Sequence, residues 1–198
     1  MTKECLEKFK FNPKREGGIG DVALSQVEVL FILKEPHDDD NRDKFWFKNV
    51  IYKNKIENNR YYTLFGILAD KLIDGDELIH DKLGKCAFVN LYPFSGGATV
   101  SKEYKALKKD IIYERVMSCV KAVNPKRIVC CLDVYDKVVK CFDVEEMGNG
   151  FKFKCNNRKF KKCRVILGNK EIDVWEFYHP ASRVKKFTKD NICIIGKE

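Results

Sequence analysis

The stretch Val27-Glu28-Val29-Leu30-Phe31-Ile32-Leu33 places six apolar residues in seven positions. A nearly continuous apolar run of this length is typical of a strand covered on both faces, as in a parallel sheet. Three later runs have the same character, namely Cys86–Leu91, Ile128–Leu132 and Ile172–Tyr178. We therefore predict that these four runs are the core strands of one sheet.

Helical patterns lie between these strands. Leucines recur four residues apart within Tyr61–Ile73, which predicts a helix there. A second helical pattern ends before Pro125, because proline cannot continue a helix, and Asp133–Phe142 is also predicted to be helical. Strands that alternate with helices favour βαβ units. The expected fold class is therefore α/β, a three-layer α/β/α arrangement with a central, mainly parallel four-stranded sheet.

The chain of 198 residues has the length of one domain, and we expect a single domain over 1–198. Its polar N-terminal segment, 1–26, contains Gly17-Gly18-Ile19-Gly20. We interpret this as a flexible entry loop, because a dinucleotide-binding glycine motif must follow a strand. Residues 151–167 alternate basic and apolar side chains, which predicts an inserted hairpin with one basic face and a turn at Asn156-Asn157.

The net charge of +9 is concentrated near the C-terminal end of the chain. Residues 151–198 carry 13 Lys and Arg against 5 Asp and Glu, whereas residues 1–150 carry 25 against 24. A local basic face indicates a polyanionic partner such as nucleic acid. The alternative is a solvated basic surface that binds nothing.

The cysteines indicate a reducing compartment. There are nine, an odd number, and Met1–Lys14 is charged throughout, without the apolar segment of a secretory leader. We therefore expect a cytoplasmic protein. No Cys-x-x-Cys occurs, so we expect no metal and no cofactor. No apolar stretch approaches the roughly 20 residues that span a bilayer, so we expect no membrane partner. No obligate protein partner is evident, and a monomer is expected.

Polar residues follow three of the predicted strands. Glu35 lies in Lys34-Glu35-Pro36-His37, Asn90 ends one strand, and His179 begins His179-Pro180-Ala181-Ser182-Arg183. The carboxyl ends of parallel strands meet at the edge where open α/β sheets bind ligands. A carboxylate can activate water, a carboxamide offers a donor and an acceptor, and an imidazole can stabilise developing negative charge. Each residue alone would pass as a loop or turn residue, but their joint placement indicates a site.

The order of acid, amide and His-Pro resembles the uracil-DNA glycosylase superfamily. Leu33-Lys34-Glu35-Pro36 is similar to that family's first motif, Gly-Gln-Asp-Pro, and Phe88-Val89-Asn90-Leu91 is similar to its strand with a base-binding Asn. The segment Phe177-Tyr178-His179-Pro180-Ala181 is similar to its closing strand and His-Pro-Ser. The resemblance runs from about residue 27 to 186, which is most of the chain.

The resemblance implies a DNA glycosylase that hydrolyses the N-glycosidic bond of uracil or a modified pyrimidine flipped out of DNA, leaving an abasic site. Glu35 would position water, and His179 would stabilise the departing base. Asn90, Pro36 and His37 would bind the base, and its stacking ring would be Phe45, Trp46 or Phe47, of which Phe47 is preferred. The residues expected to contact DNA are Ser182, Arg183, Lys185, Lys186, Arg158 and Lys161.

Several residues depart from the family pattern. Leu33 replaces its leading glycine, Ala181 replaces its serine, and Arg183 stands where the family has an apolar wedge. These differences affect the residues that would select the substrate. Two other functions fit the same pattern: a nucleic-acid-binding protein that has lost the chemistry, and a hydrolase of free nucleosides.

Overall fold

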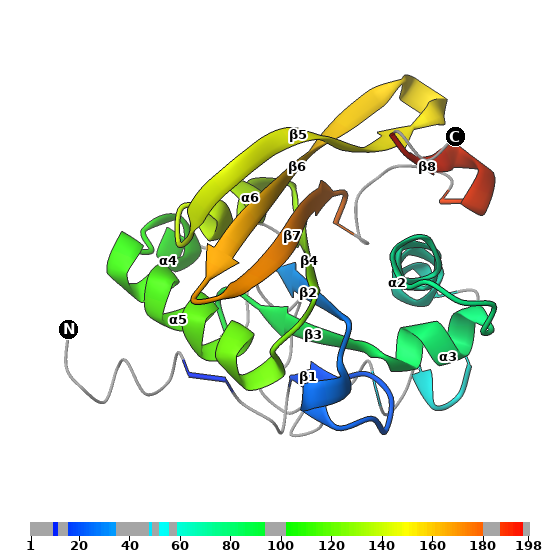
Figure 1. The fold of residues 1–198 in the computed structure, drawn as a ribbon, viewed down its shortest axis with the longest axis horizontal. Helices are drawn as coiled ribbons and strands as arrows, with labels where there is room; N and C mark the ends of the chain where they lie inside the picture. Colours follow the sequence, from blue (N-terminus) through cyan, green and yellow to red (C-terminus); the bar gives the residue numbers. More distant parts are fainter. Residues whose placement is uncertain are drawn as a thin grey trace.

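The computed structural model describes residues 10–11, 16–34, 48, 52–55, 59–93, 102–179 and 187–195. They form one eight-stranded sheet in the order β1-β3-β2-β4-β7-β6-β5-β8 (Figure 1). The strands are β1 (Gly17–Gly18), β2 (Val29–Leu33), β3 (Cys86–Asn90), β4 (Arg127–Cys131), β5 (Asp143–Phe153), β6 (Arg158–Leu167), β7 (Lys170–Phe177) and β8 (Ile192–Ile194). The described α-helices are α2 (Arg60–Leu72), α3 (Ile79–Gly84), α4 (Lys102–Lys105), α5 (Lys109–Val123) and α6 (Leu132–Val139).

The sheet is mixed, and the predicted fold class is wrong. Four of its seven strand pairings are antiparallel, and it has eight strands rather than four. The three parallel pairings join β3 to β2, β2 to β4, and β4 to β7. Antiparallel strands extend the sheet on both sides of this group, because β1 adds to β3 and the β5–β6 hairpin adds to β7.

The glycine-rich segment predicted to be a flexible loop is part of the sheet. Gly17 and Gly18 form β1 and pair antiparallel with Phe88 and Ala87 of β3. Ile19, which follows, is completely buried. Gly17 has a φ of 118°, which side chains rarely adopt, so glycine is favoured here by backbone conformation.

Helices cover both faces of the sheet, with α2 and α3 on one side and α4, α5 and α6 on the other (Figure 1). The α2 helix begins after Asn59, whose side chain accepts a hydrogen bond from the Tyr61 backbone N–H at 2.9 Å. Its leucine stripe is buried as predicted, and Phe65 stacks on Phe31 of β2 with ring centroids 4.3 Å apart. This aromatic contact fixes α2 against the centre of the sheet.

The basic hairpin is longer than the sequence predicted. Its turn lies where expected, with Asn157 in the left-handed conformation at a φ of 55°. However, β5 begins at Asp143, and its first seven residues are all exposed. They show no apolar alternation, so the sequence carries no sign of the strand there. Pairing with β6 forms it instead.

Two glycines of β5 provide a matched test of packing. A Cβ on Gly150 would lie 2.5 Å from Cε3 of Trp175, whereas a Cβ on Gly148 would meet nothing within 4 Å. We expect Gly150→Ala to lower the free energy of unfolding by about 1–3 kcal/mol through overpacking. Gly148→Ala should cause no loss. Urea denaturation of both variants measures the difference, and equal stabilities would contradict this account of the contact.

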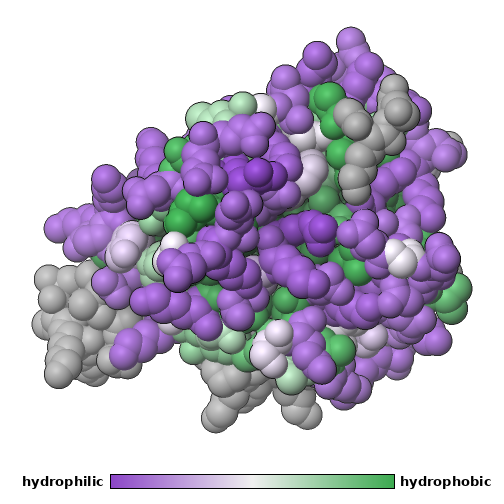
Figure 2. All heavy atoms as spheres, viewed as in Figure 1, coloured by the Kyte–Doolittle hydropathy of each residue, from purple (hydrophilic) through white to green (hydrophobic). Residues whose placement is uncertain are grey.

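Hydrophilic residues cover most of the face seen in Figure 2. The most exposed large apolar side chains of the described residues are Leu78 at 74% and Met147 at 64%, and they lie on different elements. Within the part of the chain that the structure describes, no helix has the length and apolar character needed to cross a bilayer.

Candidate functional site

The carboxyl ends of the four parallel strands lie in register at one edge of the sheet. Leu33 of β2 pairs with Asn90 of β3, and Cys131 of β4 pairs with Phe177 of β7. His179 follows two residues after Phe177. Because neighbouring strands are about 4.8 Å apart, the ends of β3 and β7 are separated by roughly 14 Å of sheet edge. Asn90 and His179 therefore lie at the same carboxyl edge of the sheet.

The order in which the chain adds strands to the sheet changes direction between β2 and β4. From β2 the chain passes to β3 on one side, while β4 leads on to β7 on the other side. Ligands of open α/β sheets bind at such a switch point, outside the carboxyl ends of the two central strands. There Lys34 and Asp133 form an ion pair at 2.7 Å, and the Tyr104 hydroxyl donates to Asp133 at 3.4 Å.

Two buried charged residues hold the backbone of Asn90. Its N–H donates to the Glu16 carboxylate at 3.2 Å, and its carbonyl accepts from Nε and Nη2 of Arg115 at 3.0 and 2.7 Å. Arg115 also forms an ion pair with Glu16. Since β1 pairs with β3 only at Ala87 and Phe88, this pair replaces the missing strand beside Asn90. The end of β3 is thereby fixed.

The carboxamide of Asn90 lies on the α2 side of the sheet. It shares a face with Phe88, two residues earlier, whose ring lies 6.2 Å from that of Phe65 in α2. The residue is 6% exposed, and its side chain forms no hydrogen bond with the described residues. A buried carboxamide with its donor and acceptor uncommitted is suited to a polar ligand.

His179 lies on the same side of the sheet, against the first turn of α2. Its ring meets that of Tyr61 edge to face, with centroids 6.0 Å apart and planes at 85°. Burial raises the pKa of the Tyr61 phenol, and the charge of a nearby Cys131 thiolate would raise it further. The phenol therefore stays protonated near neutral pH, so the group beside His179 is a neutral hydroxyl.

A cluster of five aromatic rings supports the strand end from which His179 projects. Phe160 packs on Phe177 and Tyr178 with centroids 4.6 and 4.8 Å apart. Phe153 and Phe187 close the cluster around Tyr178 at 5.6 and 6.2 Å. Such aromatic pairs stabilise beyond the area they bury. The position of His179 is thus set by a rigid core rather than by a loop alone.

The basic turn of the β5–β6 hairpin reaches this edge. Asn156 in this turn donates through Nδ2 to the hydroxyl of Tyr178, the residue before His179, at 2.9 Å. Arg158 lies 5.1 and 5.3 Å from the ring centroids of Phe160 and Tyr178. Lys161 instead forms an ion pair with Asp136 at 2.8 Å, on the α6 side of the sheet. Of these two residues, only Arg158 contacts Tyr178, which precedes His179.

Several predicted site residues lie outside the described residues. They are Glu35, Pro36, His37, Phe47, Ser182, Arg183, Lys185 and Lys186. Three residues that contact Asn90 or His179 were not predicted from the sequence, namely Tyr61, Glu16 and Arg115. A signal existed for Arg115, because it occupies the apolar stripe of its helix together with Ile112, Val116 and Cys119. A charge on such a stripe needs a buried partner.

Several cysteines form part of the core. Cys86, Cys130 and Cys131 are buried, while Cys155 is exposed. Burial raises the pKa of the Cys119 thiol to about 12, so this thiol is unreactive at neutral pH. Among the described residues, no three His, Cys, Asp or Glu side chains group closely enough to hold a metal ion.

Comparison with known proteins leaves the family open. No protein-family model matches the chain, and no curated protein is significantly similar to it. The geometry of the carboxyl edge and the sequence motifs therefore carry the functional argument.

Proposed function

We propose that the chain is a DNA glycosylase that hydrolyses the N-glycosidic bond of uracil or a modified pyrimidine flipped out of DNA. The observation that carries the proposal is the parallel register that brings Asn90 and His179 to one edge and one face of the sheet. The resemblance of the three strand-end motifs to the uracil-DNA glycosylase superfamily supports the same reading. The eight-stranded mixed sheet is wider than that resemblance implies.

The proposed hydrolysis uses the polar side chains at the carboxyl edge of the sheet. The Asn90 carboxamide donates to and accepts from the polar edge of an extruded base. His179 stabilises the negative charge that collects on the base as the glycosidic bond breaks. Glu35 positions the water that attacks the sugar. The ring of Tyr61, beside His179, offers an aromatic surface against which a base can pack.

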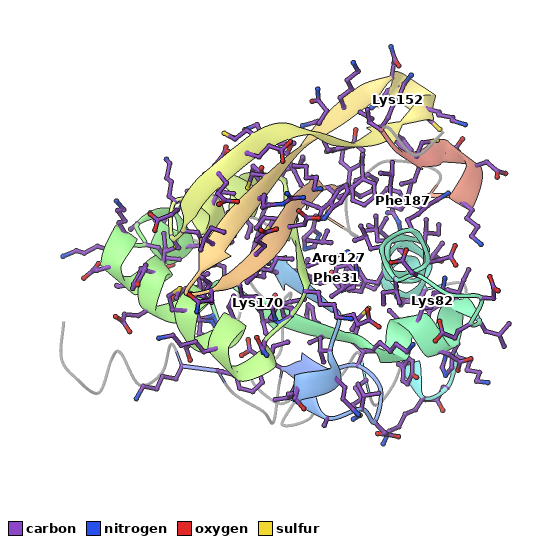
Figure 3. All side chains as sticks on the ribbon, in the orientation of Figure 1. Phe31, Lys82, Arg127, Lys152, Lys170 and Phe187 are labelled. Atoms are coloured by element: carbon purple, nitrogen blue, oxygen red, sulfur yellow. The ribbon has the colours of Figure 1, made fainter. Side chains whose placement is uncertain are left out.

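The basic turn provides the surface for the DNA backbone. Lys154, Arg158 and Lys159 are all exposed, and the turn that carries them contacts Tyr178, the residue before His179. Lys152, in the same hairpin, is labelled at the outer end of the molecule in Figure 3. Lys and Arg side chains that neutralise phosphates position a duplex without reading its sequence.

Release of a base is the direct test. The full chain is incubated with single- and double-stranded oligonucleotides that each carry one modified pyrimidine, and abasic sites are scored by alkaline strand cleavage. We expect cleavage at uracil or at one modified pyrimidine. His179→Gln should lower the rate about 100-fold, because charge on the leaving base loses its stabilising group.

His80→Gln is the matched control. His80 lies on α3, which precedes the amino end of β3, and its Nδ1 is 2.9 Å from the Tyr62 hydroxyl. Its substitution should leave the rate unchanged. Absence of abasic product across the panel would overturn the proposal. Binding without cleavage would select a nucleic-acid-binding protein, and cleavage of free nucleosides alone would select a nucleoside hydrolase.

A further inference from the structure

A cavity lies on the α2 side of the sheet, away from the carboxyl edge. It has a volume of about 370 Å³ and lies between the end of α2 and strands β5, β6 and β7. Arg127 and Asp173, which line it, pair with each other at the amino ends of β4 and β7. At about 3.3 Å per residue, His179 is roughly 20 Å further along the chain from Asp173. The cavity is therefore separate from Asn90 and His179 at the carboxyl edge, where the proposed glycosylase site lies.

The lining of this cavity is strongly basic. Four cationic side chains and two carboxylates line it, and two further carboxylates, Asp74 and Glu171, lie 3.6 Å from Arg127 and Arg164 outside the lining. The cations are Lys71, Arg127, Lys162 and Arg164, and the carboxylates are Glu146 and Asp173. Figure 3 labels Arg127 on the side of the sheet that faces α2.

The ion pairs within the lining leave positive charge available. Lys162 lies 3.0 Å from Asp173, but Arg164 approaches its three carboxylates no closer than 3.5 Å, and Arg127 approaches Asp74 only to 3.6 Å. Lys71 forms no ion pair or hydrogen bond with any described residue. These distances exceed those of strong charge-assisted hydrogen bonds. The cations are therefore able to bind an anion.

A polar atom without a partner occurs in the same lining. Among the described residues, the buried Nε1–H of Trp175 is a donor with no hydrogen-bond partner, whereas Oδ1 of Asp173 lies 3.5 Å from Nε of Arg164. Such atoms in native proteins are often explained by a bound water, ion or ligand. The Lys162 ammonium lies 4.7 Å above the Trp175 ring, so that face of the indole is covered and charge, not stacking, dominates recognition.

We propose that this cavity binds a small phosphomonoester. A phosphate monoester carries about −1.5 to −2 charges near pH 7, and the lining presents four cationic side chains to it. Guanidinium groups recognise its oxygens through paired donors. The volume falls within the usual range of small-molecule sites, so an organic group of nucleoside size fits beside the phosphate. The site is independent of the proposed glycosylase activity.

Trp175 supplies the measurement. The chain has two tryptophans, and Trp46→Phe leaves Trp175 as the single indole that reports on the cavity. In this background, fluorescence is titrated with uridine 5′-monophosphate, inorganic phosphate and uridine. We expect saturable changes with the monophosphate, and none with uridine up to about 10 mM.

Two lysine variants test the location. Lys71→Gln removes a charge from the cavity without breaking a described ion pair, and it should weaken the monophosphate about 10-fold. Lys121→Gln, in the exposed last turn of α5 on the other face, should have no effect. His179→Gln in the same background should also have no effect.

The relative affinities of inorganic phosphate and the monophosphate show which part of the ligand the cavity recognises. Inorganic phosphate that binds as tightly as the monophosphate supports a site that recognises the phosphate group alone. Tighter binding of the monophosphate supports a nucleotide ligand. Three results would overturn the proposal: no saturable change, equal binding of uridine, or loss of binding in His179→Gln with retention in Lys71→Gln. The last result would place the ligand at the carboxyl edge.

Discussion

Replacement of Arg115 by leucine is expected to lower the free energy of unfolding by about 3–5 kcal/mol, because it leaves an uncompensated buried charge. Arg115 and Glu16 are 1% and 5% exposed and form an ion pair. The arginine also donates to the backbone carbonyls of Asn90 and Lys10. Without it, the Glu16 carboxylate stays buried with its counter-charge removed. A leucine can fill the space but cannot donate a hydrogen bond.

Thermal and urea unfolding of the full chain measure this loss. For a chain of this length, a cost of that size corresponds to a fall in Tm of roughly 10 °C. The control is Lys126→Met, which breaks the ion pair between Lys126 and Glu28 at 3.2 Å. Lys126 is 66% exposed, so this change should cost less than about 1 kcal/mol.

A double variant separates the charge from the packing. Glu16→Leu together with Arg115→Leu removes both buried charges, and it should recover part of the stability lost in the single variant. If the single arginine variant lost less than about 1 kcal/mol, the pair would not be the clamp described for β3.

The four central strands were predictable because burial on both faces demands apolar residues at every position. Each predicted strand matches β2, β3, β4 or β7 to within two residues. Polar residues marked the ends of β3 and β7, since Asn90 interrupts the run Cys86–Leu91 and His179 follows the run Ile172–Tyr178. Strand direction and neighbour order then bring those residues to one edge, as expected from the alternation with helices.

The fold class was not predictable in the same way, because the outer strands do not depend on apolar sequence. β1 consists of two glycines, and the first seven residues of β5 are exposed. Both form by backbone pairing with a strand that is already in place. The supporting contacts of the site were also hidden, since Glu16 reaches Arg115 across 99 positions in sequence. No local pattern records such a contact.

The isosteric change Asn90→Asp is expected to lower the rate of base release about 100- to 1000-fold. It replaces an N–H₂ donor with a carboxylate oxygen of nearly the same shape. The carboxylate can accept hydrogen bonds but cannot donate one to the carbonyl edge of a pyrimidine. It also places negative charge beside a leaving base that becomes negative as the glycosidic bond breaks. Single-turnover rates on the responsive oligonucleotide measure the effect.

Asn124→Asp is the matched control for this change. Asn124 ends α5, and its side-chain oxygen accepts from Lys170 at 2.8 Å, a bond that aspartate retains. Its substitution should leave the rate unchanged. Melting temperatures must agree between the two variants for the comparison to report on chemistry. An Asn90→Asp protein as active as the Asn124→Asp protein would mean that the Asn90 carboxamide does not bind the base. Another side chain would then have to donate the hydrogen bond to the carbonyl edge of the pyrimidine.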